Sequence, residues 1–161
     1  MGTISIGLDD VHRKEVTTVL NQLLSDEFVL LVKTLNCHWN ISGADFRSLH
    51  LMLDEQYNAL VAICDTIAER VRALNGRSIG SMKGFHEHTR LQELPDHSAL
   101  PDAKGMIEVL TADHETVVRE LRLQHDNLDA RQHDVGTISL LEDLILKHEK
   151  MAWFLRAHIQ S

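Results

Sequence analysis

Histidine and carboxylate side chains recur at helical spacing in the first half of the chain. His50 and Asp54 are four residues apart, and so are Asp65 and Glu69. Residues four apart share one face of a helix. From Asp54 to Asp65 is eleven residues, about three turns, so both pairs face nearly the same way. With His38 just upstream, this set of imidazoles and carboxylates suits Fe(II), with Zn(II) and Mn(II) as competitors.

One helix cannot bring the two pairs to a single ion. They lie roughly 16 Å apart along the axis, whereas metal–ligand bonds are about 2 Å long. Two arrangements remain open. Each pair could be an independent weak site, or a second antiparallel copy of the chain could match Asp65 and Glu69 of one subunit with His50 and Asp54 of the other. The second arrangement predicts a two-fold dimer with two identical sites, and His38 could swing in beside His50.

A plainer interpretation also exists, because the chain has 11 histidines and 24 acidic residues. A single pair with this spacing is more often part of a solvated helix face than a set of metal ligands. The presence of five candidate ligands on one side, His38 among them, favours a metal site.

Four long segments carry apolar residues at the spacing of an amphipathic helix. The first begins after Asp9 and Asp10 and ends near residues 40–43, and the second covers residues 44–74 and stops at Asn75 and Gly76. A third opens at Pro101, and the last covers residues 137–159. This pattern predicts an all-α four-helix bundle.

The connections between these segments differ in length. Residues 77–101 form a long middle connection, in which we expect a short helix near residues 82–88, with Met82, Phe85 and Leu91 pinning it to the bundle. Residues 126–136 are polar and are expected to break the pattern before the last helix. His148 falls on the apolar stripe of that helix and is predicted to be a hydrogen-bonded core histidine.

Composition sets wider bounds on the protein. A chain of 161 residues with 2 Pro and 8 Gly fits one domain, residues 1–161, built from a few long helices. No run of residues is long and apolar enough for a membrane span, and the first residues lack the features of a secretory signal. We therefore expect a cytoplasmic protein, in which Cys37 and Cys64 are reduced and packed.

The motif Glu-x-x-His is absent from the sequence. Four-helix proteins that hold two metal ions within one subunit use that motif on two of their helices. An iron pair inside a single subunit is therefore not expected.

Several stretches resemble the Dps miniferritins. They are Cys37-His38-Trp39-Asn40, residues 50–57 (HLMLDEQY), residues 65–70 (DTIAER), residues 79–83 (IGSMK) and residues 148–156 (HEKMAWFLR). The spacing His, x11, His, x3, Asp, x10, Asp, x3, Glu is the intersubunit ferroxidase pattern of that family, and the resemblance covers nearly the whole chain.

The resemblance implies a ferritin-like bundle with a short extra helix in the middle connection, assembled into a hollow homododecamer. It implies a ferroxidase that oxidises Fe(II), preferably with hydrogen peroxide, and stores the ferric mineral. Asp65 and Glu69 would bind iron from one subunit and His38, His50 and Asp54 from its two-fold mate, in a mono-iron or di-iron centre.

Members of that family often carry two acids around the start of the last helix, where they line a three-fold entry pore for iron. Here Asp134 is present, but Ser139 stands at the second acidic position, so the entry funnel is expected to be weaker. The alternative interpretation of this stretch is a solvated polar turn.

Two other functions have less support in the sequence. Some relatives compact DNA through Lys- and Arg-rich tails, and a nucleoid-compacting shell with a secondary iron role is the alternative function. The segment before Val11 has no Lys or Arg, and the net charge of -8 opposes contact with phosphates, so tight DNA binding is not expected. A purely structural shell is disfavoured because all five ligand positions are filled.

Overall fold

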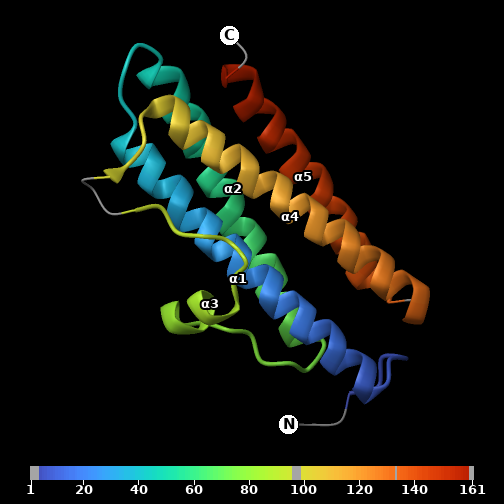
Figure 1. Cartoon of the computed structure of the whole chain (residues 1–161). Helices are drawn as coiled ribbons and strands as arrows, with labels where there is room; N and C mark the ends of the chain where they lie inside the picture. The colour runs from blue at the N-terminus through green and yellow to red at the C-terminus, as the bar shows by residue number, and fades with distance from the viewer. Residues whose placement is uncertain (1–3, 96–98, 133, 160–161) are drawn as a thin grey trace.

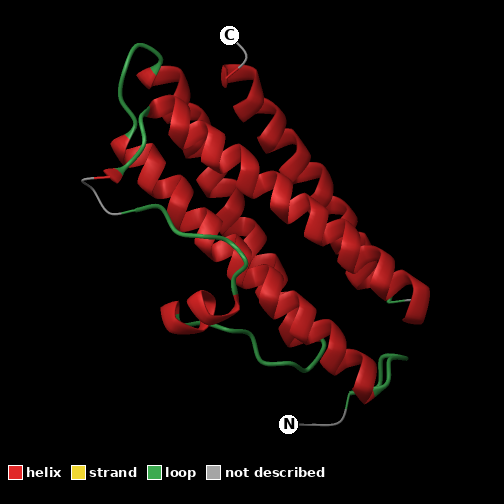
Figure 2. Cartoon of the chain, in the orientation of Figure 1, coloured by secondary structure: helices red, strands yellow, loops and turns green. Residues whose placement is uncertain are grey.

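The computed structural model describes residues 4–95, 99–132 and 134–159. These residues form five helices and no strand (Figures 1 and 2), which confirms the all-α prediction. The helices are α1 (Asp10–Asn40), α2 (Phe46–Ala73), α3 (Met82–His88), α4 (Ala103–Gln132) and α5 (Val135–Ile159).

The four long helices associate in two pairs. α1 packs mainly on α2, and α4 packs mainly on α5, with α1 and α4 joining the two pairs. The connection from α2 to α4 crosses the bundle and carries α3 against α1 (Figure 1). Leucine, isoleucine and valine side chains from all four long helices fill the centre. None of the helices in the described ranges is long and apolar enough to cross a membrane.

The start of α1 and the end of α2 form where the sequence provides capping residues. The Asp9 side chain accepts a hydrogen bond from the backbone N–H of His12 at 2.8 Å and starts α1. After α2, Asn75 adopts the left-handed conformation with φ of 63°, which ends the helix as predicted. The following Gly76 lies so close to α1 that a Cβ atom there would be 2.6 Å from Cγ2 of Thr17. Glycine therefore permits the close approach of this turn to α1.

Two expectations about the connections are wrong. The polar stretch after residue 125 does not break the helix, because α4 continues to Gln132. Leu128 is buried seven residues after Leu121, so the apolar stripe goes on while the polar residues occupy the outer face. The other error concerns Met82, which is 62% exposed and does not pin α3 to the bundle.

The short helix is held by its other apolar residues. Phe85 is buried and stacks on Phe28 of α1, with ring centroids 4.1 Å apart. Leu91, just after the helix, is buried as well. The bounds of α3 are the predicted ones, and its attachment rests on Phe85 and Leu91.

A buried carboxylate ties the crossing connection to the bundle. Asp26 of α1 is 1% exposed and accepts hydrogen bonds from the Thr89 hydroxyl at 3.0 Å and from the backbone N–H and the side-chain Nε of Arg90, at 2.6 and 2.9 Å. Arg90 also reaches Glu120 of α4 at 2.6 Å. Because each of these groups is paired, the connection is fixed to both α1 and α4.

We expect Asp26→Asn to lower the free energy of unfolding by about 3 kcal/mol, because it removes the buried anion of the Arg90 guanidinium, which then keeps only the half-buried Glu120 as a charged partner. Urea unfolding at a fixed protein concentration measures the change. The control is Asp10→Asn, whose side chain is 83% exposed and pairs with Arg13; it should change stability by less than about 0.5 kcal/mol. Equal losses in the two variants would contradict this role of Asp26.

Candidate functional site

Two histidines face each other where α1 ends and α2 begins. His38 and His50 stack with ring centroids 3.8 Å apart and ring planes 16° from parallel. Nδ1 of His38 lies 3.0 Å from the backbone oxygen of His50, and Nδ1 of His50 lies 2.9 Å from the backbone oxygen of His38. The structure therefore brings together these two predicted ligands through reciprocal side-chain to backbone contacts across the turn.

These contacts fix the protons on both rings. A carbonyl oxygen only accepts hydrogen bonds, so each Nδ1 must carry a proton and donate it. A neutral imidazole then has its lone pair on Nε2. Metal-binding histidines commonly donate their second ring nitrogen to a backbone carbonyl in the same way. His38 and His50 thus each present an oriented Nε2 that can bind a metal ion.

Asp54 lies one turn after His50 and is held by neighbours on α2. The Tyr57 hydroxyl donates to Oδ1 of Asp54 at 2.9 Å, and the Tyr57 ring meets His38 edge-on at 5.2 Å. The hydrogen bond to Asp54 raises the pKa of the Tyr57 phenol above its usual value. The phenol therefore stays protonated at neutral pH and continues to donate to the carboxylate.

Tyr57 and Phe46 are contact residues that the sequence analysis missed. Tyr57 lies three residues after Asp54, a spacing that places both on one helix face and could have identified it. Phe46 stacks on the His50 ring with centroids 5.0 Å apart and is 45% exposed. Its only sequence signal is a position one turn before His50.

Asp65 and Glu69 form a separate acidic pair further along α2. Both are exposed, and the described hydrogen bonds and ion pairs of the chain involve neither carboxylate. The described residues contain no group of three His, Cys, Asp or Glu side chains arranged to hold a metal ion. One chain therefore brings His38 and His50 together but leaves Asp65 and Glu69 apart from them.

The residue after Glu69 anchors this end of α2. Arg70 donates from Nη2 to Oδ1 of Asp134 at 2.7 Å and from Nε to the Thr137 hydroxyl at 3.0 Å. A Cβ atom on Gly136 would lie 3.0 Å from the guanidinium, so glycine allows Arg70 to pack against the start of α5. Asp65 and Glu69 therefore project from a helix segment that is clamped to its neighbour.

The burial of Asp134 differs from the expectation of a solvated polar turn. Asp134 is 4% exposed and accepts a hydrogen bond from the backbone N–H of Thr137 at 3.1 Å, which caps α5. The interpretation of this stretch as a solvated polar turn is therefore wrong for Asp134. Ser139 is exposed on α5.

The two cysteines are buried free thiols. Burial raises the pKa of Cys37 to about 12 and that of Cys64 to about 12. Only the thiolate is a strong ligand or nucleophile. Both side chains therefore act as packing residues at neutral pH, as the sequence predicts.

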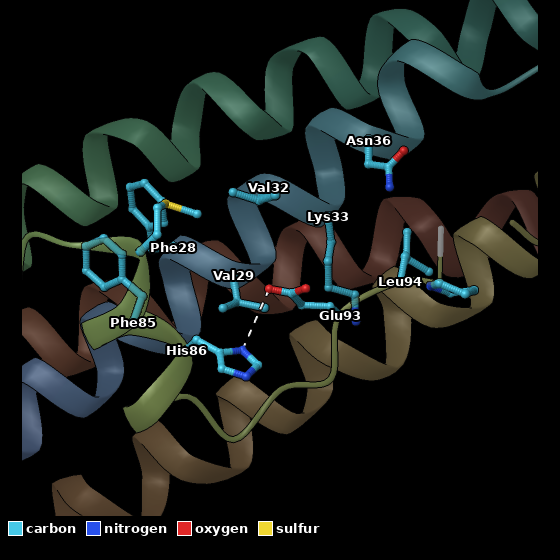
Figure 3. Close-up of a pocket in the computed structure, with 11 residues that line it drawn as sticks. Phe28, Val29, Val32, Lys33, Asn36, Phe85, His86, Glu93 and Leu94 are labelled. Atoms are coloured by element: carbon cyan, nitrogen blue, oxygen red, sulfur yellow. Dashed lines mark ion pairs between the residues drawn. The ribbon is translucent and has the colours of Figure 1, made fainter. Parts of the chain in front are cut away.

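A cavity of about 330 Å³ lies between α1, α3 and the segment that follows α3 (Figure 3). His86 and Glu93 approach each other at its edge, with Nδ1 and Oε1 3.8 Å apart. Lys33 lines it, but Nζ of Lys33 donates to the backbone oxygen of Gln92 at 2.6 Å and pairs with Asp113. None of the five predicted metal ligands lines this cavity.

Comparison with known proteins identifies clear relatives. Residues 17–161 match the family model described as a ferritin-like domain. An uncharacterised low temperature-induced protein of Nostoc sp. is 44% identical over 100% of this chain and 89% of its own length. The DNA protection during starvation protein 2 of Bacillus anthracis is 34% identical over 92% of this chain and 99% of its own.

A solved structure shares the whole fold. The crystal structure of the Dps protein from Vibrio cholerae O1 superposes with a TM-score of 0.89 at 30% identity, over 99% of this chain and 98% of that one. It is described as a member of a broad superfamily of ferritin-like diiron-carboxylate proteins.

We expect Tyr57→Phe to weaken metal binding at the histidine pair by about tenfold, because groups that orient a ligand typically contribute that much to affinity. Anaerobic Fe(II) titration calorimetry measures the effect. Thr66→Ala is the control, because this exposed hydroxyl of α2 bonds only to the backbone of its own helix. An unchanged affinity in Tyr57→Phe would show that the phenol does not support the site.

Proposed function

Because this chain belongs to the ferritin-like family, and within it to the Dps miniferritins, we propose that it oxidises Fe(II) at sites shared between two subunits and stores the ferric product. The observation that carries the proposal is the reciprocal His38–His50 contact, which engages both Nδ1 atoms and leaves the two Nε2 lone pairs available for a metal ion. Iron enters this scheme as the substrate of the protein.

The sharing of each site between subunits follows from the two separate half-sites. His38, His50 and Asp54 form one half, and Asp65 and Glu69 form the other, roughly three helix turns away on the same face of α2. An antiparallel two-fold mate would set the acidic half of one chain against the histidine half of the other, twice per dimer. Exposed and unpaired carboxylates at Asp65 and Glu69 support this arrangement. The full assembly in this proposal is a homododecamer.

The ligand types favour oxidation. Three carboxylates, Asp54, Asp65 and Glu69, would bring three negative charges to each site, and these stabilise Fe(III) more than Fe(II). The neutral imidazoles complete the shell without further charge. Hydrogen peroxide is the proposed oxidant: two Fe(II) ions lose one electron each, and one H2O2 takes both electrons as its O–O bond breaks, which gives two hydroxide ions. Free Cys37 and Cys64 are in keeping with a reducing, cytoplasmic location.

The double variant Asp65→Asn with Glu69→Gln is expected to slow peroxide-driven Fe(II) oxidation at least about a hundredfold, because it removes two of the carboxylates that stabilise Fe(III). Stopped-flow absorbance after anaerobic Fe(II) loading measures the rate. Size-exclusion chromatography should show unchanged assembly. Glu55→Gln, an exposed carboxylate beside Asp54 on another face of α2, is the matched control and should oxidise normally. Equal rates in the double variant and the control would refute the assignment.

A mixing experiment separates shared sites from sites within one chain. A His38→Ala with His50→Ala variant and the Asp65→Asn with Glu69→Gln variant should each be inactive. Shells co-assembled from equal amounts of the two should regain about a quarter of the intact sites, because half of the random dimers pair unlike chains and each such dimer restores one site of two. If the mixture stays inactive although the chains co-assemble, the sites are not shared as proposed.

DNA protection is the function named for some relatives, but the charge of this chain opposes it. A net charge of -8 repels the phosphate backbone, whose binding depends on Lys and Arg displacing counterions. In a gel shift at physiological salt and neutral pH, we expect no retarded DNA band. A retarded band that disappears at high salt would overturn this expectation and bring the DNA-compacting alternative forward.

A further inference from the structure

Three ionisable side chains meet in the centre of the bundle, away from the proposed metal site. Glu27 of α1, His114 of α4 and His148 of α5 are each 0% exposed. Nε2 of His148 lies 3.0 Å from Oε1 of Glu27, and its Nδ1 lies 2.9 Å from Nδ1 of His114. The prediction of His148 as a hydrogen-bonded core histidine is confirmed, and its partners form a chain across three helices.

The geometry limits how many protons this chain can hold. Two ring nitrogens 2.9 Å apart must share a single proton, because one donates and the other accepts. The contact between His148 and Glu27 likewise takes one proton, carried by either the imidazole or the carboxyl group. When His114 also bears a proton on Nε2, the three groups are neutral as a set. This is the largest number of protons that the chain holds with both contacts intact.

One more proton has no suitable place. On Nδ1 of His114 it would face the proton that His148 donates, and the contact would break. Anywhere else in the chain it would leave a net positive charge in an apolar core, which is costly without a paired anion. Both oxygens of Glu27 and the Nε2 atoms of His114 and His148 lack a well-aligned hydrogen-bond partner among the described residues. The 3.0 Å contact between His148 and Glu27 is therefore a close ion-pair contact, and Nε2 of His114 has no acceptor.

The ionisable groups on neighbouring helices do not compensate the positive charge that an additional proton would create. From α2, Cys64 faces Glu27, and burial together with the Glu27 carboxylate keeps that thiol protonated. The next acid on α4, Asp113, is engaged by Lys33 of α1. Burial and the neighbouring His148 lower the pKa of His114 well below its ordinary value of 6.5. His114 therefore stays neutral in the folded chain at a pH where an unfolded chain would protonate it.

We propose that the Glu27–His148–His114 chain is an acid-sensitive element that loosens the packing of α4 and α5 against α1 as the pH falls. Below about pH 6.5 the opened state, in which both imidazoles are charged, binds one proton more than the neutral folded set, so stability declines as the pH falls below that value. For one proton, the opening equilibrium constant rises by up to about tenfold per pH unit.

Hydrogen–deuterium exchange of the assembled, iron-free protein tests this proposal. Protection of backbone amides in α4 and α5 near His114 and His148, corrected for the intrinsic pH dependence of exchange, should fall by up to about tenfold per unit between pH 6.5 and 5. In His114→Asn the amide can keep a hydrogen bond near the position of Nδ1 but does not titrate, so the fall should disappear. The exposed His88→Gln, on α3, is the matched control and should behave as the unmodified chain.

A second variant guards against failure of the first to fold. Glu27→Gln removes the anion that balances a proton on the imidazoles, so the loss of protection should begin at higher pH than in the unmodified protein. Protection in α4 and α5 that is constant from pH 7 to 5, or that declines equally in His114→Asn, would overturn the proposal. The proposal would also be overturned if the loss of protection began at the same pH in Glu27→Gln as in the unmodified protein.

Discussion

The reciprocal hydrogen bonds between His38 and His50 are the interaction on which the candidate site depends. They join the last turn of α1 to the first turns of α2, so one contact both closes the helix hairpin and sets the tautomer of two imidazoles. Tyr57 extends the contact by touching His38 and holding Asp54. The histidine half of the proposed site is therefore part of the packing of the bundle, and its orientation is established when the hairpin folds.

Buried polar groups hold the rest of the bundle in register. Asp26 ties the crossing connection to α1 and α4 through Arg90, and Asp134 ties α5 to α2 through Arg70. Apolar burial is non-directional, whereas each of these pairs has one geometry that satisfies its donors and acceptors. The helices thus gain stability from leucine-rich packing and a defined arrangement from a few charged contacts.

The sequence was sufficient for the features that repeat along a helix or lie close in the chain. The four long helices, the bounds of α3 and the burial of His148 follow from apolar periodicity and caps. It was insufficient where a residue's role depends on a partner far along the chain. The burial of Asp134 requires Arg70, and the partners of His148 come from helices more than thirty residues away. The expectation for Met82 was wrong because α3 has only seven residues, and two apolar side chains, Met82 and Phe85, do not show which of them faces the bundle.

The separation of the two half-sites along α2 affects the stage of assembly at which the protein can act on iron. If the sites are shared as proposed, a newly made subunit carries an oriented histidine half and an open acidic half, but no complete centre. Oxidation of iron then begins only once subunits have met. The insoluble ferric product would thus arise only where an enclosing wall is already being built, and the distance between two pairs of side chains on one helix would protect the cell from mineral formed in the wrong place.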